Sequence, residues 1–317
     1  MAEIGYTLSS EEHPPNDLIR NAERAEEAGF AFAMISDHYH PWTGHQGESA
    51  FVWSVIGAIA SRTEKLRLGT GVTCPTMRIH PAVIAQAAAT CAAMMPGRFF
   101  LGVGTGESLN EHITGQRWPP APERLRMLEE AIEIMHHLWE GKEVTHTGEF
   151  FVVQDARIYS LPVHPPSIMV AAAGSKAAEL AGRKGDGIIG TKPDPELLER
   201  FDRAGGAGKP RYGKVTVCWA ESEAEARRTA HEWWPNSALQ GELGQELPLP
   251  RHFEQAIAQV TQEQVAKSVV CGPEPGRHIE AVQELVEAGY DHVFVHQIGP
   301  NQEGFLAFYE DEVIRKL

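Results

Sequence analysis

Short apolar runs alternate along the chain with longer segments in which apolar residues recur at helical spacing. The apolar runs have the usual length of buried strands and lie at 3–8, 30–36, 66–72, 98–104, 167–173, 186–190, 212–219 and 291–298. The helical segments lie at 15–28, 49–62, 81–94, 121–140, 175–184, 194–204, 221–234, 274–288 and 302–316. Nearly every expected strand is therefore followed by a helix.

This alternation predicts one α/β domain over residues 1–317, a single (β/α)8 TIM barrel. The strands are apolar on both faces, as in parallel sheets that helices cover. A doubly wound open sheet is the alternative. Two inserts interrupt the pattern, one at 142–165, where GEFFVVQDARIY predicts a hairpin, and one at 235–262, rich in Pro, Leu and Gln. Such inserts on a barrel usually lie at the active-site mouth or at a subunit interface.

Polar residues follow the expected strands at their carboxyl ends, where barrel enzymes carry their active sites. These residues occupy positions 9–12, 37–40, 71–74, 105–110, 173–176, 191–192 and 296–297. Since the carboxyl ends of parallel strands meet on one face of a barrel, the sequence predicts an active site there.

Composition narrows the classes of partner. The chain has 43 acidic and 28 basic residues and a formal charge of −15, which argues against nucleic acid or an anionic membrane as a partner. The four cysteines lie far apart and form no CxxC motif, so we expect reduced, mostly buried thiols in a cytoplasmic protein. We expect neither a membrane span nor a basic, apolar leader.

The segment ISDHYHPW, at 35–42, places an Asp, two His and a Trp just after an expected strand. His38 and His40 resemble the HxH of metal-dependent barrel hydrolases. Such a site also needs His residues from middle strands and an Asp from the last strand. The fifth expected strand ends in AAAG, and the eighth offers His296 but no Asp. We therefore expect no metal.

The segment GVGTGE, at 102–107, resembles the start of a dinucleotide-binding GxGxxG motif. Its third glycine is missing, it follows the fourth expected strand, and no acidic ribose partner follows at the expected distance. We interpret it instead as a Gly-rich loop where a flat ring can approach the backbone.

Four segments together carry a family resemblance: ISDHYHPW, LGTGVTCPT, HPAVIAQAAATCAAMMPGRFFLGVGTGESLNEH and AAELAGRKGDGII. The chain resembles the bacterial luciferase-like flavin and deazaflavin oxidoreductases. Within them it is most similar to the branch that uses coenzyme F420, an 8-hydroxy-5-deazaflavin, and to the glucose-6-phosphate dehydrogenases of that branch. The resemblance runs from Glu3 to about Leu198 and resumes near the end of the chain.

This resemblance implies an F420-dependent dehydrogenase that moves a hydride from the hemiacetal carbon of a sugar 6-phosphate to C5 of the coenzyme. His38 matches the catalytic base, Trp42 a residue that stabilises the reacting centre, and Glu107 a proton source beside the coenzyme ring. Glu11 matches another active-site acid. Imidazole suits the base because it exchanges protons near neutral pH. The structural alternatives are a packing His38, a core Trp42, and a Glu107 that caps a helix with Asn110.

The resemblance also implies a set of coenzyme contacts. Residues 173–175 pass from a strand to a helix, whose free N–H groups would suit a phosphate of the coenzyme tail. Gly71 and Val72 match a non-prolyl cis peptide of the family, although a plain strand end explains them equally well. The implied contacts are Asp37, Gly71, Val72, Thr105, Gly106, Asn110, Ala173, Gly174 and Ser175.

The substrate-binding residues match the family less well. Related enzymes hold the sugar phosphate with a Thr, two Lys and an Arg. Thr191 matches the Thr, Lys192 lies two positions before one Lys, and Ser268 occupies the place of the Arg. Arg251 and His252 are candidate replacements, and a charged helix start explains them equally well.

Three functions remain open. An F420-dependent sugar-phosphate dehydrogenase is favoured, and an F420-dependent secondary alcohol dehydrogenase is its alternative. An FMN-dependent monooxygenase on the same barrel and a coenzyme-binding protein without turnover are the others. The small-molecule substrate and F420 are the expected partners, together with a second copy of the chain. The Ala-rich run at 85–93 suggests this homodimer, but tight packing on the barrel would explain the run as well.

Overall fold

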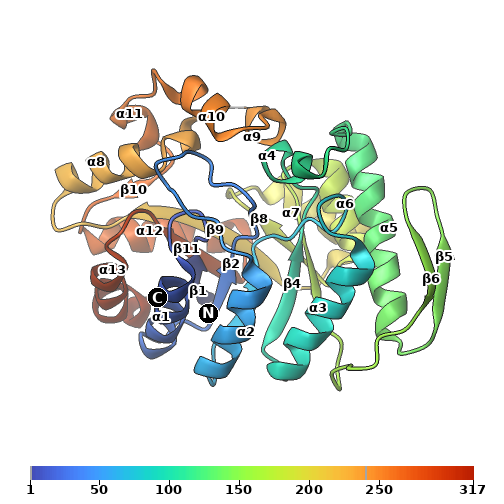
Figure 1. Cartoon of the computed structure of the whole chain (residues 1–317). Coiled ribbons are helices and arrows are strands. Elements are labelled where there is room, and N and C mark those ends of the chain that lie inside the picture. The colour runs from blue at the N-terminus through green and yellow to red at the C-terminus, as the bar shows by residue number, and fades with distance from the viewer. Residues whose placement is uncertain (1, 240) are drawn as a thin grey trace.

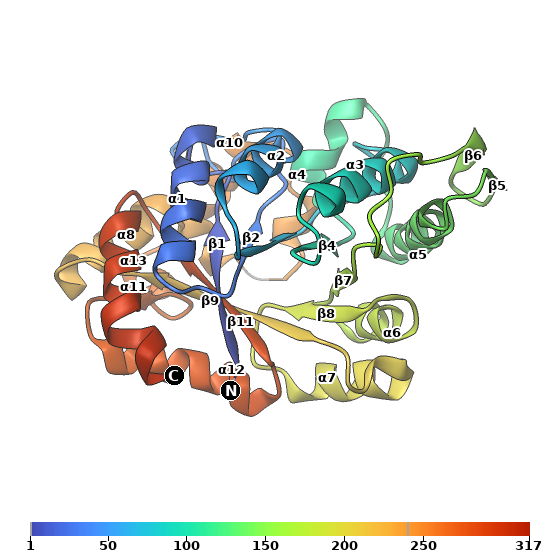
Figure 2. The ribbon, with the colours of Figure 1, turned by 90° about the horizontal axis from the view of Figure 1, so that it is seen from below.

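Eight parallel strands close into a barrel in the computed structural model, which describes residues 2–239 and 241–317. Figure 2 shows this ring of strands with helices around it. Neighbours follow the order β9-β11-β1-β2-β3-β4-β7-β8, and pairing of β8 with β9 closes the barrel. The strands are β1 (Glu3–Leu8), β2 (Phe32–Ile35), β3 (Arg67–Thr70), β4 (Phe99–Val103), β7 (Ile168–Ala171), β8 (Gly187–Gly190), β9 (Arg211–Cys218) and β11 (His292–Gln297). The predicted TIM barrel is confirmed, and the open sheet is wrong.

Helices form the outer layer of the barrel (Figure 1). They are α1 (Pro15–Glu27), α2 (Val52–Arg62), α3 (Pro81–Met94), α5 (Ala121–Trp139), α6 (Ser175–Lys184), α7 (Pro195–Phe201), α8 (Glu223–Trp233), α12 (Pro275–Ala288) and α13 (Gln302–Phe308). Each lies within or close to an expected helical segment. The last part of segment 194–204 differs, because the chain widens into a π-turn over Asp202–Gly206, where Gly205 has a φ of 101°.

Local sequence signals set where these helices begin. Proline lies in the first turn of α1, α3, α5, α7 and α12, where its missing N–H costs no hydrogen bond. Side chains cap other starts: Asp194 accepts from the Leu197 N–H at 3.0 Å, and Ser222 accepts from the Glu225 N–H at 3.3 Å.

Large side chains fill the lower part of the barrel interior. Gly69 makes room for one of them, because a Cβ at this position would lie 2.1 Å from the Phe100 ring. The interior cluster comprises Phe32, Met34, Phe100, Met169, Ile189, Tyr212 and Phe294. This packed layer closes the bottom of the barrel, so a ligand can enter only from the other end.

The two inserts add short elements around the barrel. The first holds an antiparallel hairpin, β5 (Val144–Thr147) with β6 (Val152–Ala156), which projects beside α5 in Figure 1. A hairpin was expected there, but its first strand precedes the segment GEFFVVQDARIY. The second insert region lies near α4 (Ser108–Glu111) and holds α9 (Leu243–Glu246) and α10 (Pro250–Ile257). It is followed by α11 (Gln262–Val265) and β10 (Val270–Cys271).

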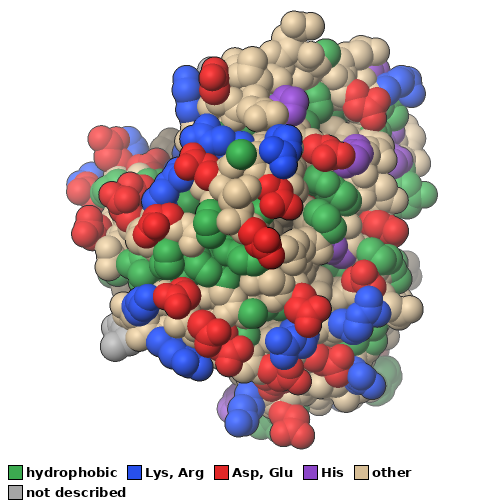
Figure 3. Space-filling model, turned by 90° about the vertical axis from the view of Figure 1, so that its left-hand side faces the viewer, with side chains coloured by type: hydrophobic (Ala, Val, Ile, Leu, Met, Phe, Trp, Pro, Cys, Tyr) green, Lys and Arg blue, Asp and Glu red, His purple; other side chains and the backbone are tan. Residues whose placement is uncertain are grey.

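The surface and the cysteines agree with the composition. On the face in Figure 3, acidic and basic side chains are interspersed. All four cysteines are buried and unpaired, as expected. Within the described ranges, we find no helix whose length and apolar character would let it cross a bilayer.

Candidate active site

A cavity of about 780 Å³ opens at the carboxyl ends of the barrel strands, a volume typical of small-molecule sites. Most of the predicted site residues line it, namely Glu11, His38, Trp42, Gly71, Val72, Thr105, Gly106, Glu107, Ala173, Gly174, Ser175 and Thr191. The remaining predicted residues do not line it: Asp37, Asn110, Lys192, Arg251 and His252.

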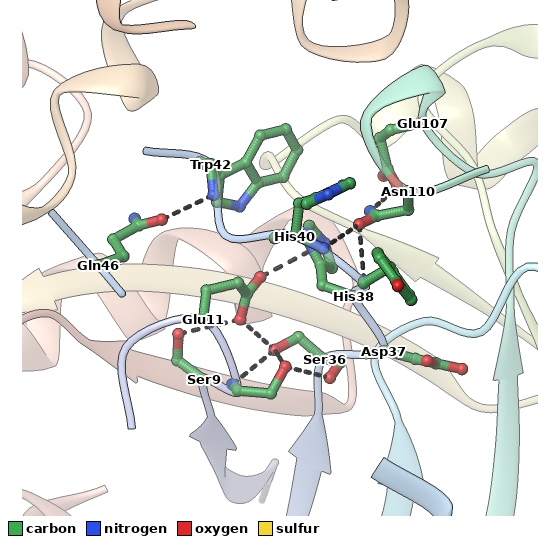
Figure 4. Close-up of polar contacts among 12 residues, drawn as sticks. Ser9, Glu11, Ser36, Asp37, His38, His40, Trp42, Gln46, Glu107 and Asn110 are labelled. Atoms are coloured by element: carbon green, nitrogen blue, oxygen red, sulfur yellow. Dashed lines mark hydrogen bonds and ion pairs between the residues drawn. The ribbon is translucent and has the colours of Figure 1, made fainter. Parts of the chain in front are cut away.

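Glu11 and His38 form an acid–imidazole pair in the wall of this cavity (Figure 4). Glu11 follows β1, His38 follows β2, and both side chains are buried. The Glu11 Oε1 atom lies 3.4 Å from His38 Nε2. Its Oε2 atom accepts hydrogen bonds from the hydroxyl groups of Ser9 and Ser36.

These contacts favour a charged carboxylate at Glu11. Burial alone would raise its pKa, but the adjacent His38, the Ser36 hydroxyl and a backbone hydrogen bond outweigh burial and lower it. His38 Nδ1 lies 3.2 Å from the His40 carbonyl oxygen, which only an Nδ1–H can satisfy. The neutral His38 ring therefore has its lone pair on Nε2, next to the Glu11 carboxylate. The two residues are thus arranged so that His38 Nε2 can accept a proton.

Trp42 packs against His38. Its ring centroid lies 5.0 Å from that of His38 and 5.3 Å from that of Phe253 in α10, with which it forms a T-shaped pair. Gln46 fixes the Trp42 backbone by accepting its N–H at 2.9 Å and by donating to the Trp233 carbonyl at 2.9 Å. Trp42 is therefore a wall residue rather than a barrel-core aromatic.

Asn110 joins two loops of the site without lining the cavity. Its Oδ1 accepts the N–H groups of Tyr39 and His40, at 2.9 and 3.2 Å. Its Nδ2 donates to Glu107 Oε2 at 3.3 Å. Glu107 precedes α4 but makes no side-chain cap bond, and its carboxyl group lines the cavity instead.

Asp37 points away from the Glu11–His38 pair (Figure 4). Its carboxylate binds Arg78 at 2.8 Å and the Thr73 hydroxyl at 2.8 Å. Arg78 also lies 3.5 Å from Glu111, which accepts the Arg78 N–H at 2.8 Å. These three charged side chains are almost completely buried. Asp37 thus supports the loop that carries His38, where the sequence suggested a coenzyme contact.

One side of the cavity consists largely of backbone. Gly71 and Val72, joined by a cis peptide, lie beside Gly104, Thr105 and Gly106. Gly106 has a φ of 76°, and a Cβ there would lie 2.6 Å from Cys74 Sγ. This wall presents little side-chain bulk, so a planar ring can lie close to it.

The start of α6 forms another side. Gly174 is its N-cap residue and makes no side-chain cap bond. Residues 173–176 are exposed and line the cavity. The N–H groups of this first turn are therefore free for an anionic group.

The second insert covers part of the cavity. Gly241, Glu242, Gly244 and Gln245 line it, next to the start of α5. Buried Arg124 in α5 holds this cover, because its guanidinium binds Gln245 at 3.1 Å and Glu246 at 3.2 Å. Arg251 and His252 instead begin α10 outside the cavity lining, as a charged helix start.

A second, fully buried acid–imidazole pair joins the ends of β1 and β11. Glu12 Oε2 lies 2.9 Å from His296 Nε2, and Glu12 Oε1 accepts the Gly299 N–H at 2.9 Å. Burial raises the pKa of the Glu12 carboxyl to about 7, and burial lowers the pKa of His296 well below its ordinary value. Below pH 7 the pair therefore consists of a protonated carboxyl and a neutral imidazole.

Stability should depend on this carboxyl. The folded chain holds the Glu12 proton up to a pKa of about 7, whereas the ordinary pKa is 4.5. The stabilisation is therefore full below pH 4.5 and is lost as the pH rises through 7. We expect Glu12→Gln to show a smaller loss of unfolding free energy than wild type between pH 5 and 7.5, measured by urea unfolding. Glu143→Gln, at an exposed position, is the control, and an unchanged pH slope in Glu12→Gln would contradict the assignment.

Lys214 of β9 lines the cavity and was not identified from the sequence. It lies in a run that was interpreted only as a buried strand. The sequence signal for Lys214 was its place on the same face of the strand as Tyr212, which lies two residues before it. Of the residues that the structure describes, no three His, Cys, Asp or Glu side chains gather as metal ligands would.

The chain is similar to known proteins over its whole length. The model of the family described as Luciferase-like monooxygenase matches residues 1–292. The F420-dependent glucose-6-phosphate dehydrogenase of Microbacterium testaceum is 38% identical and covers 99% of this chain and 97% of its own. The enzyme of the same name from Intrasporangium calvum is 35% identical, over 99% of this chain and 98% of its own.

Solved structures show the same likeness. An F420-dependent secondary alcohol dehydrogenase in complex with an F420–acetone adduct has a TM-score of 0.91 at 27% identity, covering 98% of both chains. A coenzyme F420-dependent tetrahydromethanopterin reductase from Methanopyrus kandleri has a TM-score of 0.78 at 21% identity, covering 99% of both. At 21% identity, the likeness to the reductase shows a shared fold alone.

Proposed function

Because the chain belongs to the luciferase-like family and is similar over its full length to F420-dependent members, we propose that it is a coenzyme F420-dependent dehydrogenase that oxidises a sugar 6-phosphate. It is an oxidoreductase acting on CH–OH groups. The Glu11–His38 pair carries the proposal, since oxidation of a hydroxyl group requires a base in the cavity. The relatives' names support the sugar phosphate.

The residues present fit the coenzyme. The backbone wall of 71–72 and 104–106 suits a flat deazaflavin ring, and the free N–H groups at the start of α6 suit a tail phosphate. When bound, F420 supplies a ring carbon that accepts a hydride and does not activate oxygen. Thr105, Gly106, Ala173, Gly174 and Ser175 would hold it.

The chain's own residues manage the proton. His38 Nε2 takes the hydroxyl proton of the substrate as the hydride leaves the adjacent carbon. Glu11 then stabilises the imidazolium, and the His40 carbonyl keeps the ring in the orientation that places Nε2 beside Glu11. Trp42 packs against His38 in the wall of the cavity. Glu107 lies next to the backbone wall, where it can hold a proton close to the coenzyme.

A secondary alcohol is the second candidate substrate. The observation in its favour is that Lys192, Arg251 and His252, expected to bind phosphate, do not line the cavity. The structural likeness to an F420-dependent secondary alcohol dehydrogenase also supports it.

Two measurements test the function. Titration with F420 and with FMN, followed by quenching of tryptophan fluorescence, should show tighter binding of F420. Loss of F420 absorbance should then be measured with glucose 6-phosphate, fructose 6-phosphate, mannose 6-phosphate, free glucose and isopropanol. Tighter FMN binding would overturn the cofactor assignment. Turnover of isopropanol alone would replace the sugar phosphate with the alcohol.

We also propose that two copies of the chain associate, in a reducing cytoplasm that suits the four free thiols. The alanine-rich face of α3 packs against the rest of its own chain, since Ala85, Ala88 and Ala89 are buried there. The first insert instead exposes Val152, Tyr159 and Val163. Light scattering should give twice the monomer mass, and a monomer would refute the dimer.

A further inference from the structure

We propose that Lys214, Thr7 and His296 form an anion-binding subsite that holds the phosphate of the substrate on the inner wall of the barrel. The inference rests on the proposed function, since it names the group that recognises the substrate. The three residues lie on the neighbouring strands β9, β1 and β11 and all line the cavity. β11 pairs with both of the other strands, so the three form one continuous patch of wall.

Lys214 is the cationic residue inside the cavity. Among the described residues, Lys176 and Lys214 are the only Lys or Arg that line it. Lys176 is exposed at the start of α6, on the side assigned to the coenzyme tail. Lys214 pairs in register with Phe294, whose ring belongs to the layer that fills the barrel. Its side chain therefore rises from the bottom of the cavity.

The ammonium group of Lys214 has no carboxylate partner within the described part of the chain. Both nearby carboxylates are engaged elsewhere. Glu11 binds His38, Ser9 and Ser36, and Glu12 binds His296 and the Gly299 N–H. The Lys214 ammonium instead lies 5.7 Å from the centre of the Trp234 ring. Desolvation lowers the pKa of Lys214, although the nearby Glu11 and Glu12 carboxylates act to raise it. A net lowering is expected for a buried cation without an ion-pair partner.

Two more polar atoms at this wall lack partners. Thr7 Oγ1 and His296 Nδ1 are buried and make no hydrogen bond with any described residue. Buried polar groups are normally hydrogen-bonded, so each such group indicates a missing partner. When the protonated Glu12 carboxyl donates to His296 Nε2, the imidazole carries its hydrogen on Nδ1.

A phosphate against the Lys214 ammonium would also supply the acceptor that Thr7 Oγ1 and His296 Nδ1 lack, once these side chains turn toward it. The ammonium offers three donors, the Thr7 hydroxyl one, and His296 Nδ1–H one. Charge-assisted hydrogen bonds to phosphate oxygens are the strong ones, and they strengthen where water is excluded. The same wall would serve in place of Lys192, Arg251 and His252, none of which reaches the cavity lining.

The test measures binding without the coenzyme. Calorimetric titration should give wild type at least about tenfold tighter binding of glucose 6-phosphate than of free glucose. Lys214→Met keeps the apolar stem and removes the charge, so it should weaken glucose 6-phosphate by about tenfold or more and leave glucose unchanged. Inorganic phosphate should compete with glucose 6-phosphate in wild type, and glucuronate tests whether a carboxylate can replace the phosphate. Lys267→Met, at an exposed position, is the matched control.

Three results would overturn the subsite. The first is equal affinity of wild type for glucose and glucose 6-phosphate, and the second is unchanged binding of glucose 6-phosphate by Lys214→Met. The third is an equal loss of affinity for both ligands in Lys214→Met, which would make Lys214 a counter-ion of Glu11 and Glu12. If Lys214→Met does not fold, the subsite is tested instead by the affinity of Thr7→Val for glucose 6-phosphate and by competition from inorganic phosphate in wild type. Phosphate binding that depends on Lys214 without any F420 reduction would sustain the subsite and refute the proposed function.

Discussion

Replacing His38 with alanine is expected to lower kcat by about 100-fold or more at pH 7, while the affinity for F420 stays close to wild type. Removal of a general base typically costs about 10²–10⁴ in rate. The variant leaves Glu11 bound to Ser9 and Ser36, so the loop keeps its other contacts. Stopped-flow reduction of F420 and fluorescence titration measure the two quantities separately.

The control for this experiment is His164→Ala, because His164 is exposed and does not line the cavity. It should retain wild-type turnover. Near-full turnover in His38→Ala would remove His38 from the mechanism. An equal loss of coenzyme affinity and turnover would indicate a binding residue rather than a base.

Replacing Arg78 with methionine is expected to lower the free energy of unfolding by about 3–5 kcal/mol, the usual cost of removing one partner from a buried ion pair. Asp37 would lose its cation in a site with almost no solvent contact. Glu111 should suffer less, since burial already raises its pKa to about 7 and it can bind a proton instead. Urea unfolding at pH 7 measures the change.

Arg126→Met is the matched control, since Arg126 and Glu149 form an exposed ion pair at 3.0 Å. Such pairs contribute about 1 kcal/mol or less. Adding Asp37→Asn to Arg78→Met should restore part of the loss, because it removes the uncompensated charge. Similar small losses in both arginine variants would show that the buried cluster contributes little.

Much of this architecture follows from hydrophobic pattern alone. Eight apolar runs separated by amphipathic segments leave few folds, and the carboxyl ends of the strands bring Glu11, His38 and Glu107 together despite their distance in sequence. The short helices of 235–262 were not predicted, because elements of four to eight residues are too short to show a period.

The partners of individual charges were less predictable. Asp37 binds Arg78, which lies 41 residues away in a loop, and no local pattern specifies that pair. Lys214 was hidden in an apolar strand, although a charged residue at an inward position of a barrel strand is a usable signal. Arg251 and His252 were candidate replacements for phosphate ligands that the resemblance left unmatched, with a charged helix start as the alternative, and the start of α10 lies outside the cavity lining.

The segment that covers the cavity has an evolutionary consequence. Glu242 and Gln245 line the cavity, and the segment is anchored by Arg124, by the Gly44 N–H, which Glu254 accepts at 2.9 Å, and by the buried Phe253 ring. Glu11 and His38 follow barrel strands, whereas Phe253 of this segment contacts Trp42 beside His38. Chimeras that exchange residues 235–262 between relatives and retain Phe253 and Arg124 are therefore a direct route to new substrate preferences on unchanged hydride chemistry.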